Sequence, residues 1–67
     1  MIFPDSPKWL PAVERGIQIA VSRREKGLDI SFGALYADFI NSCQDVPIKW
    51  LDMFTYAVRD TIVDNCT

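Results

Sequence analysis

The stretch SFGALYADFINSC, residues 31–43, has the most regular apolar pattern in this chain of 67 residues. Its apolar side chains recur at spacings of three and four, as they do along one face of an α-helix. The residues on this face are Phe32, Leu35, Tyr36, Phe39, Ile40 and Cys43. The pattern predicts an amphipathic helix over residues 32–43. Ser31 is suited to cap its start, because the hydroxyl accepts a hydrogen bond from an unpaired N–H group of the first turn, although Asp29 competes for that role.

A helix over about residues 11–26 is predicted before it. Pro11 fits the first helical position, where its missing N–H group would have no partner in any case. Glu14 lies in the first turn and basic residues lie in the last, so the charges at both ends match the helix dipole. Gly27 follows as a residue that readily takes the left-handed conformation in which many helices end.

The apolar stripe of this first helix is expected to face the core. It consists of Leu10, Val13, Ile17, Ala20 and Val21. Gly16 interrupts the helix at a cost of about 1 kcal/mol relative to alanine. We therefore expect a neighbouring helix or side chain to approach closely at Gly16. Ile19 lies off the stripe and is expected to be exposed.

A third helix is predicted over about residues 47–64, with Pro47 in its first position. Its inward stripe is Ile48, Leu51, Phe54, Ala57, Val58, Thr61 and Ile62, and a second apolar set beside it is Trp50, Met53, Tyr56 and Val63. A helix with apolar residues on two faces is either central in its domain or buried in a contact with another molecule.

Residues 1–10 are predicted to form an ordered, non-helical arm. Pro4, Pro7 and Pro11 lie close together, and each restricts its own backbone and that of the preceding residue. The arm is too apolar for a free tail, so we expect it to lie across the helices. A helix that starts near Ser6 is disfavoured, because Pro11 would then lie one turn inside it.

Together these elements predict an all-α fold, a small three-helix bundle that forms one domain over residues 1–67. The connections are short, so neighbouring helices should run antiparallel. The first and third helices then point the same way. This arrangement predicts that the basic group Arg23, Arg24 and Lys26 offsets the charges of Asp60 and Asp64.

Composition and charge exclude several classes of protein. Seven Lys and Arg against nine Asp and Glu give a net charge of −2, which is not the basic balance typical of nucleic-acid binding. No apolar run approaches the roughly 20 residues that a membrane span needs, and we expect no signal peptide. Cys43 and Cys66 are too few for a disulfide framework. We expect a cytoplasmic protein with reduced thiols, Cys43 in the core and Cys66 exposed near the end.

The sequence offers few groups for catalysis. It contains no histidine, the commonest general base and metal ligand. Neither cysteine has an activating neighbour in the sequence. Asp60 and Asp64, one turn apart, make only a weak metal site, and the three glycines do not form a phosphate-binding motif. The sequence therefore predicts a protein that is not an enzyme and has no cofactor, metal or small-molecule substrate.

The surplus of apolar side chains indicates a protein-interaction module. Hydrophobic residues make up 49% of a chain too short to bury them all. The candidate partner-binding residues are Trp50, Met53, Tyr56, Trp9, Arg23 and Arg24. Both tryptophans have an alternative role in packing, Trp9 as a cap on the open end of the bundle. We predict a regulator or inhibitor that occludes a protein partner, or a homodimer. Phage-accessory and antitoxin-like proteins share this outline by analogy of size and fold alone.

The alternative is a helix-turn-helix transcriptional regulator. Three helices with a short link before the third have that outline, and the third would be the recognition helix. Its early outward positions hold one cation, Lys49, and one anion, Asp52, with large apolar rings. Phosphate contacts need Lys and Arg. The only basic cluster, Arg23 and Arg24 with Lys26, is better explained as a solvated helix end that complements the dipole.

Overall fold

The computed structural model describes residues 2–65, with side chains to residue 63. It contains three helices: α1 (Trp9–Glu25), α2 (Phe32–Ser42) and α3 (Ile48–Asn65). No strand occurs among the described residues. The predicted all-α, three-helix fold is confirmed. Cys66 lies outside the described residues.

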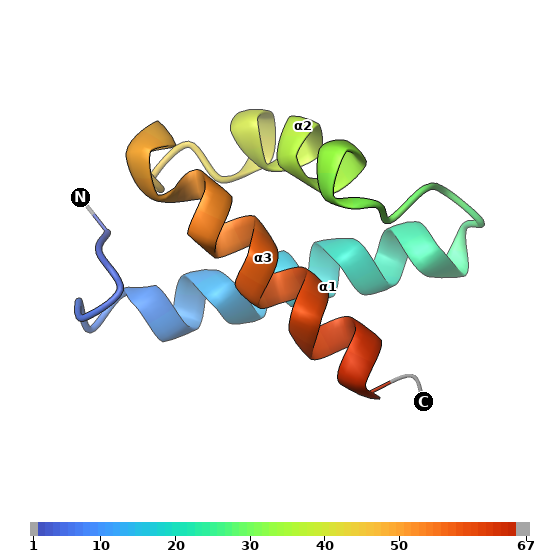
Figure 1. Cartoon of the computed structure of the whole chain (residues 1–67), viewed down its shortest axis with the longest axis horizontal. Coiled ribbons are helices and arrows are strands. Elements are labelled where there is room, and N and C mark those ends of the chain that lie inside the picture. The colour runs from blue at the N-terminus through green and yellow to red at the C-terminus, as the bar shows by residue number, and fades with distance from the viewer. Residues whose placement is uncertain (1, 66–67) are drawn as a thin grey trace.

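The third helix is the central element. Figure 1 shows α1 and α2 running in opposite directions, and α3 crossing obliquely over α1. α3 packs against both other helices, whereas α1 and α2 make few direct contacts. Two explanations were predicted for the two apolar faces of this helix, a central position or a contact with another molecule. The central position explains part of the second face.

The start of α1 differs from the prediction. The helix begins at Trp9 rather than Pro11, so Pro11 is its third residue. The first four N–H groups of a helix have no partner inside it, and a proline is therefore accepted there. Before the helix the chain forms hydrogen-bonded turns, in which Ser6 N–H donates to the Phe3 carbonyl at 2.9 Å and Trp9 N–H to the Ser6 carbonyl at 3.0 Å.

The end of α1 confirms the role predicted for Gly27. Its φ of 75° is in the left-handed region. Gly27 N–H donates to the Arg24 carbonyl at 3.0 Å, and Leu28 N–H donates to the Arg23 carbonyl at 2.9 Å. This pair of bonds is a Schellman motif, and it satisfies two carbonyls that the helix leaves without partners.

The start of α2 uses both predicted caps. The Ser31 hydroxyl accepts from Ala34 N–H at 3.5 Å. Asp29 in turn accepts from Ser31 N–H at 2.9 Å and from the Ser31 hydroxyl at 3.0 Å. Asp29 therefore holds the capping serine rather than replacing it.

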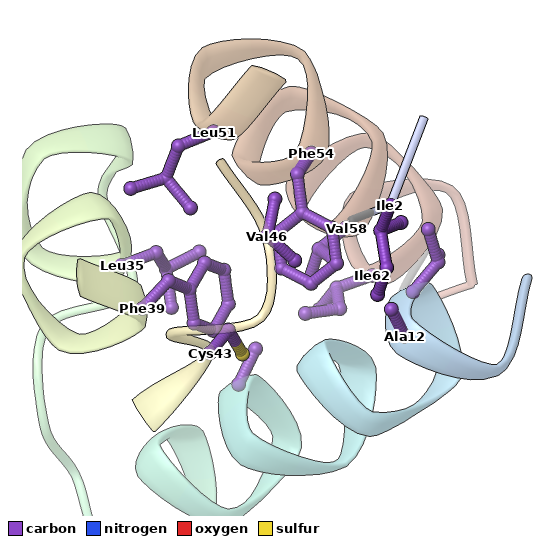
Figure 2. Close-up of a cluster of buried hydrophobic side chains, with 12 residues drawn as sticks. Ile2, Ala12, Leu35, Phe39, Cys43, Val46, Leu51, Phe54, Val58 and Ile62 are labelled. Atoms are coloured by element: carbon purple, nitrogen blue, oxygen red, sulfur yellow. The ribbon is translucent and has the colours of Figure 1, made fainter. Parts of the chain in front are cut away.

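The core lies between α3 and the other two helices (Figure 2). Its centre is the edge-to-face pair Phe39 and Phe54, whose ring centroids are 5.2 Å apart. The buried hydrophobic residues are Ile2, Ala12, Val13, Ala20, Leu35, Phe39, Cys43, Val46, Leu51, Phe54, Val58 and Ile62. Cys43 is a free thiol within this core, as predicted.

The buried face of α1 differs from the predicted stripe. Val13 and Ala20 are buried as predicted, but Leu10 is 70% exposed, and Ala12 and Gly16, which lie outside the predicted stripe, are buried. The buried face is centred on the small residues Ala12, Gly16 and Ala20, which allow α3 to come close. Ile19, predicted to be exposed, packs half-buried against the core on the same side.

Two further core predictions are wrong. Ile48 is 73% exposed because it is the first residue of α3 and no neighbouring side chain covers it. Ile40 is 43% exposed, at the outer edge of α2. Thr55, which the apolar pattern passed over, is fully buried.

The charges at the end of α1 have different partners from those predicted. Arg23 forms an ion pair with Asp38 of α2 at 3.4 Å and donates from Nε to the Asp29 carbonyl at 3.0 Å. Of the described side chains, only Arg15 and Asp45 form another ion pair, at 2.6 Å. Asp60 is thus not paired with the basic group, and the Asp64 side chain lies outside the described part. Both ion pairs join α1 to α2 or to the loop after it.

Candidate protein-binding face

The outward side of α3 carries exposed apolar side chains. Tyr56 is 64% exposed and Met53 is 47% exposed. With Asp52, Ala57 and Asp60 they line a shallow, open hollow along the helix. The middle of the hollow is apolar, and a carboxylate lies toward either end.

Aromatic contacts extend the exposed surface at Tyr56 from α3 onto α2. Its ring centroid lies 5.6 Å from that of Phe32, and Phe32 stacks on Tyr36 at 6.0 Å. Phe32 and Tyr36 are half-buried rather than fully enclosed. Both residues were predicted to lie in the core, and the prediction did not include their partly exposed edges. The sequence signal for this contact was the spacing of four residues between Phe32 and Tyr36, which places both rings on one face of α2 beside the antiparallel α3.

Trp50 lies on a different side of α3 from Tyr56. Its ring packs edge-to-face with Phe3, with centroids 5.6 Å apart, and Lys49 Nζ lies 5.8 Å from the ring centre. The indole N–H is buried and has no hydrogen-bond partner among the described residues. The structure thus places Trp50 in the contact between the N-terminal turns and α3, apart from Met53 and Tyr56.

Trp9 also lies apart from the exposed face. It is half-buried, and its ring meets the core residue Phe54 edge-to-face at 5.8 Å. This placement matches the alternative in which Trp9 closes the bundle. A large ring contributes much to core burial in so small a domain.

A groove between α1 and α2 contains the predicted basic residue Arg23. Arg15, Asp38, Ser42 and Lys26 also line it. Arg15 and Arg23 are engaged in the ion pairs described above, and the Ser42 hydroxyl donates to Asp38 at 2.9 Å. Most of the charge in this groove therefore serves to join the two helices. Arg24 is exposed at the end of α1 and does not line the groove.

Cys43 is the one thiol in the described part of the chain. Burial raises the pKa of the Cys43 thiol, and the facing Arg15 guanidinium opposes that shift only in part. The thiol is therefore protonated at neutral pH, and a thiol is a poor nucleophile in that form. No group of three potential metal ligands occurs in the described part of the chain. Among its helices, none is long and apolar enough to cross a membrane.

The chain matches no protein-family model, and comparisons with curated proteins and with solved structures find no similar one.

Proposed function

We propose that this chain is a small non-enzymatic protein-binding module that acts as a regulator or inhibitor by covering part of a partner protein. One observation carries the proposal. Large exposed apolar side chains are concentrated on α3, at Ile48, Met53, Tyr56 and Val63. Exposed apolar residues scattered singly are normal, but neighbouring ones such as Met53 and Tyr56, which line one hollow on α3, mark an interaction surface.

The composition of this face supports a protein partner. Tyrosine is enriched among the residues that dominate binding energy at interfaces. Full burial of an apolar side chain contributes about 1.5–3 kcal/mol, so covering Met53 and Tyr56 would favour association. Phe32 supports the Tyr56 ring from α2, at 5.6 Å, and reduces the freedom that Tyr56 would lose on binding.

The charges near this face favour protein over DNA as the partner. Lys49 stands at the start of α3, but Asp52 and Asp60 lie on the exposed side further along. Carboxylates repel the phosphate backbone that supplies most non-specific DNA affinity. We place the module in the cytoplasm, where a free buried thiol such as Cys43 remains reduced.

Site-specific photo-cross-linking tests the proposal. The photoreactive residue p-benzoyl-phenylalanine would replace Tyr56 in one sample and Glu14, an exposed residue on α1, in the control. After irradiation of cells that express the chain, we expect protein adducts of higher mass from position 56 and none from position 14. An absence of adducts from position 56, or equal adducts from both positions, would contradict the proposal.

A further inference from the structure

The outward side of α3 carries a regular stripe of exposed residues. They follow one another at spacings of three and four, and they are Ile48, Asp52, Tyr56, Arg59 and Val63. We call these five residues the α3 stripe. This is the spacing at which one helix presents a continuous seam to another. The stripe lies on the side of α3 that includes Tyr56, away from Trp50 and the N-terminal turns.

The order of chemical types along the α3 stripe reads the same from either end, except that the charge changes sign. An apolar residue stands at each end, a charged residue comes next, and Tyr56 lies near the middle. The midpoint between Ile48 and Val63 falls between Thr55 and Tyr56. The midpoint between Asp52 and Arg59 falls at the same place. Two such stripes in opposite directions are therefore complementary.

We propose that the α3 stripe is the docking surface for a second copy of this chain, which packs antiparallel across a two-fold axis. In this arrangement Ile48 faces Val63 of the second copy, and Asp52 faces Arg59 of the second copy. The axis relates the two Tyr56 rings near the centre. A two-fold interface uses the same surface on both copies, as this stripe requires. The inference rests on the proposed function and names the partner.

The charges distinguish this arrangement from others. Asp52 and Arg59 are seven residues apart, about 10 Å along the helix, too far to pair with each other. Within the described side chains neither takes part in an ion pair, since the pairs present are Arg15–Asp45 and Arg23–Asp38. In a parallel arrangement Asp52 would face Asp52 of the second copy, and Arg59 would face Arg59 of the second copy. Like charges placed opposite each other oppose association. The antiparallel register pairs all four charges.

The second helix widens the contact. On α2 the half-buried Phe32 ring contacts Tyr56, and the half-buried Tyr36 ring stacks on Phe32. Ile40 continues their spacing toward the end of α2 and is 43% exposed. Two copies joined through α3 would therefore bring α2 of each copy to the edge of the same interface. Four helices would pack together, an arrangement common among helical proteins.

Charge reversal tests the proposal by sedimentation equilibrium. The variants are D52R and R59D, each at an exposed position where folding should be retained. Each variant alone places like charges opposite each other twice per dimer. We expect the dimer dissociation constant to rise about tenfold or more. E14R, on α1, changes the net charge as D52R does and should leave the dissociation constant unchanged. Circular dichroism would verify that each variant is folded.

Two further samples test whether charge complementarity between the two copies causes the effect. The double variant D52R/R59D restores opposite charges and should dimerise about as well as the wild type. An equimolar mixture of D52R and R59D should also associate, because each charge on one chain then faces its opposite on the other. A generic loss of a surface contact would produce neither recovery.

Three results would overturn the second-copy pairing. These are a wild type that remains monomeric at millimolar concentration, single variants that dimerise like the wild type, and a mixture that fails to associate. If the pairing fails while position 56 still cross-links to another protein, the proposed function stands. If position 56 gives no adduct either, both fail.

Discussion

Gly16 of α1 lies against Val58 of α3 with no room for a side chain between them. A Cβ atom on Gly16 would lie 2.8 Å from Val58 Cγ2 and 2.9 Å from Phe54 Cζ. Real Cβ contacts are not so short. Ala12 and Ala20, one turn before and after, are also buried. These three small residues allow α3 to cross α1 closely, and that crossing leaves the other side of α3 facing outward (Figure 1).

Gly16→Ala should destabilise the fold. Alanine is the better helix former by about 1 kcal/mol, but overpacking against Val58 and Phe54 costs about 1–3 kcal/mol. We expect a net loss in the free energy of unfolding, measured by urea denaturation. Gly33→Ala is the matched control, because a Cβ there meets nothing within 4 Å. It should leave the stability unchanged or raise it. A Gly16→Ala variant more stable than the wild type would show that the crossing is looser than described.

Thr55→Val should stabilise the fold. The Thr55 side chain is fully buried, and its hydroxyl has no hydrogen-bond partner among the described residues. A buried hydroxyl without a partner costs about 1–3 kcal/mol, and valine has nearly the same shape. We expect a gain of about 1 kcal/mol in a thermal or urea melt. Thr55→Ser retains the hydroxyl and loses the methyl group, so it should be less stable than the wild type. Equal stability of the valine variant and the wild type would indicate that the hydroxyl is satisfied.

The sequence was sufficient to predict the three helices and most of the buried residues of α2 and α3, but only part of the buried side of α1. The spacing of large apolar residues by three and four predicted the buried side of α2 correctly, because Leu35, Phe39 and Cys43 are both apolar and buried. In α1 the same rule selected Val13 and Ala20 correctly, but it also selected the exposed Leu10 and passed over the small buried residues Ala12 and Gly16. Contact area depends on how closely two helices approach, and a pattern of large side chains does not show this.

The Cys43 thiol should react slowly while the chain is folded. It is 1% exposed, and burial raises its pKa, so little reactive thiolate forms at neutral pH. In a Cys66→Ser background Cys43 is the only thiol, and its reaction with a disulfide reagent can be followed alone. We expect the rate to follow the population of unfolded chain and to rise steeply with urea. Rapid labelling without denaturant would mean that the core opens near the end of α2.

The stability should decrease when the solution is made more acidic than about pH 4, near the ordinary carboxyl pKa. The Arg15 guanidinium lowers the pKa of Asp45, and hydrogen bonds from Ser31 lower the pKa of Asp29. A carboxyl whose pKa is lower in the folded state stabilises that state above its unfolded pKa. That stabilisation is lost as the pH falls through the folded pKa.

Asp45→Asn isolates one of these two groups. The Asp45 side chain is 51% exposed, so solvent screens its ion pair with Arg15. We expect a loss of at most about 1 kcal/mol at pH 7 and a smaller decrease in stability on acidification. Urea melts from pH 7 to pH 3 would measure both effects. An unchanged pH dependence would show that the Arg15–Asp45 pair does not form in solution.

The candidate site was predictable in part. Met53 and Tyr56 stand out in the sequence as apolar residues beside an already complete core stripe. Trp50 belongs to the same second apolar set in the sequence, but Phe3 of the N-terminal turns packs against its ring. The spacing of residues along one helix does not predict contacts with a segment so far away in the chain. The contribution of Phe32 likewise depends on how α2 lies beside α3.

The central claim is that the outward side of α3 is an interaction surface whose partner is a second copy of the chain. Amide chemical shifts of the isotope-labelled chain, recorded by NMR from micromolar to millimolar concentration, test it most directly. We predict concentration-dependent shifts at Ile48, Asp52, Tyr56 and Arg59, and constant shifts at Glu14 and Gln18 on the outward side of α1. Shifts that do not change with concentration, or changes confined to α1, would contradict the account.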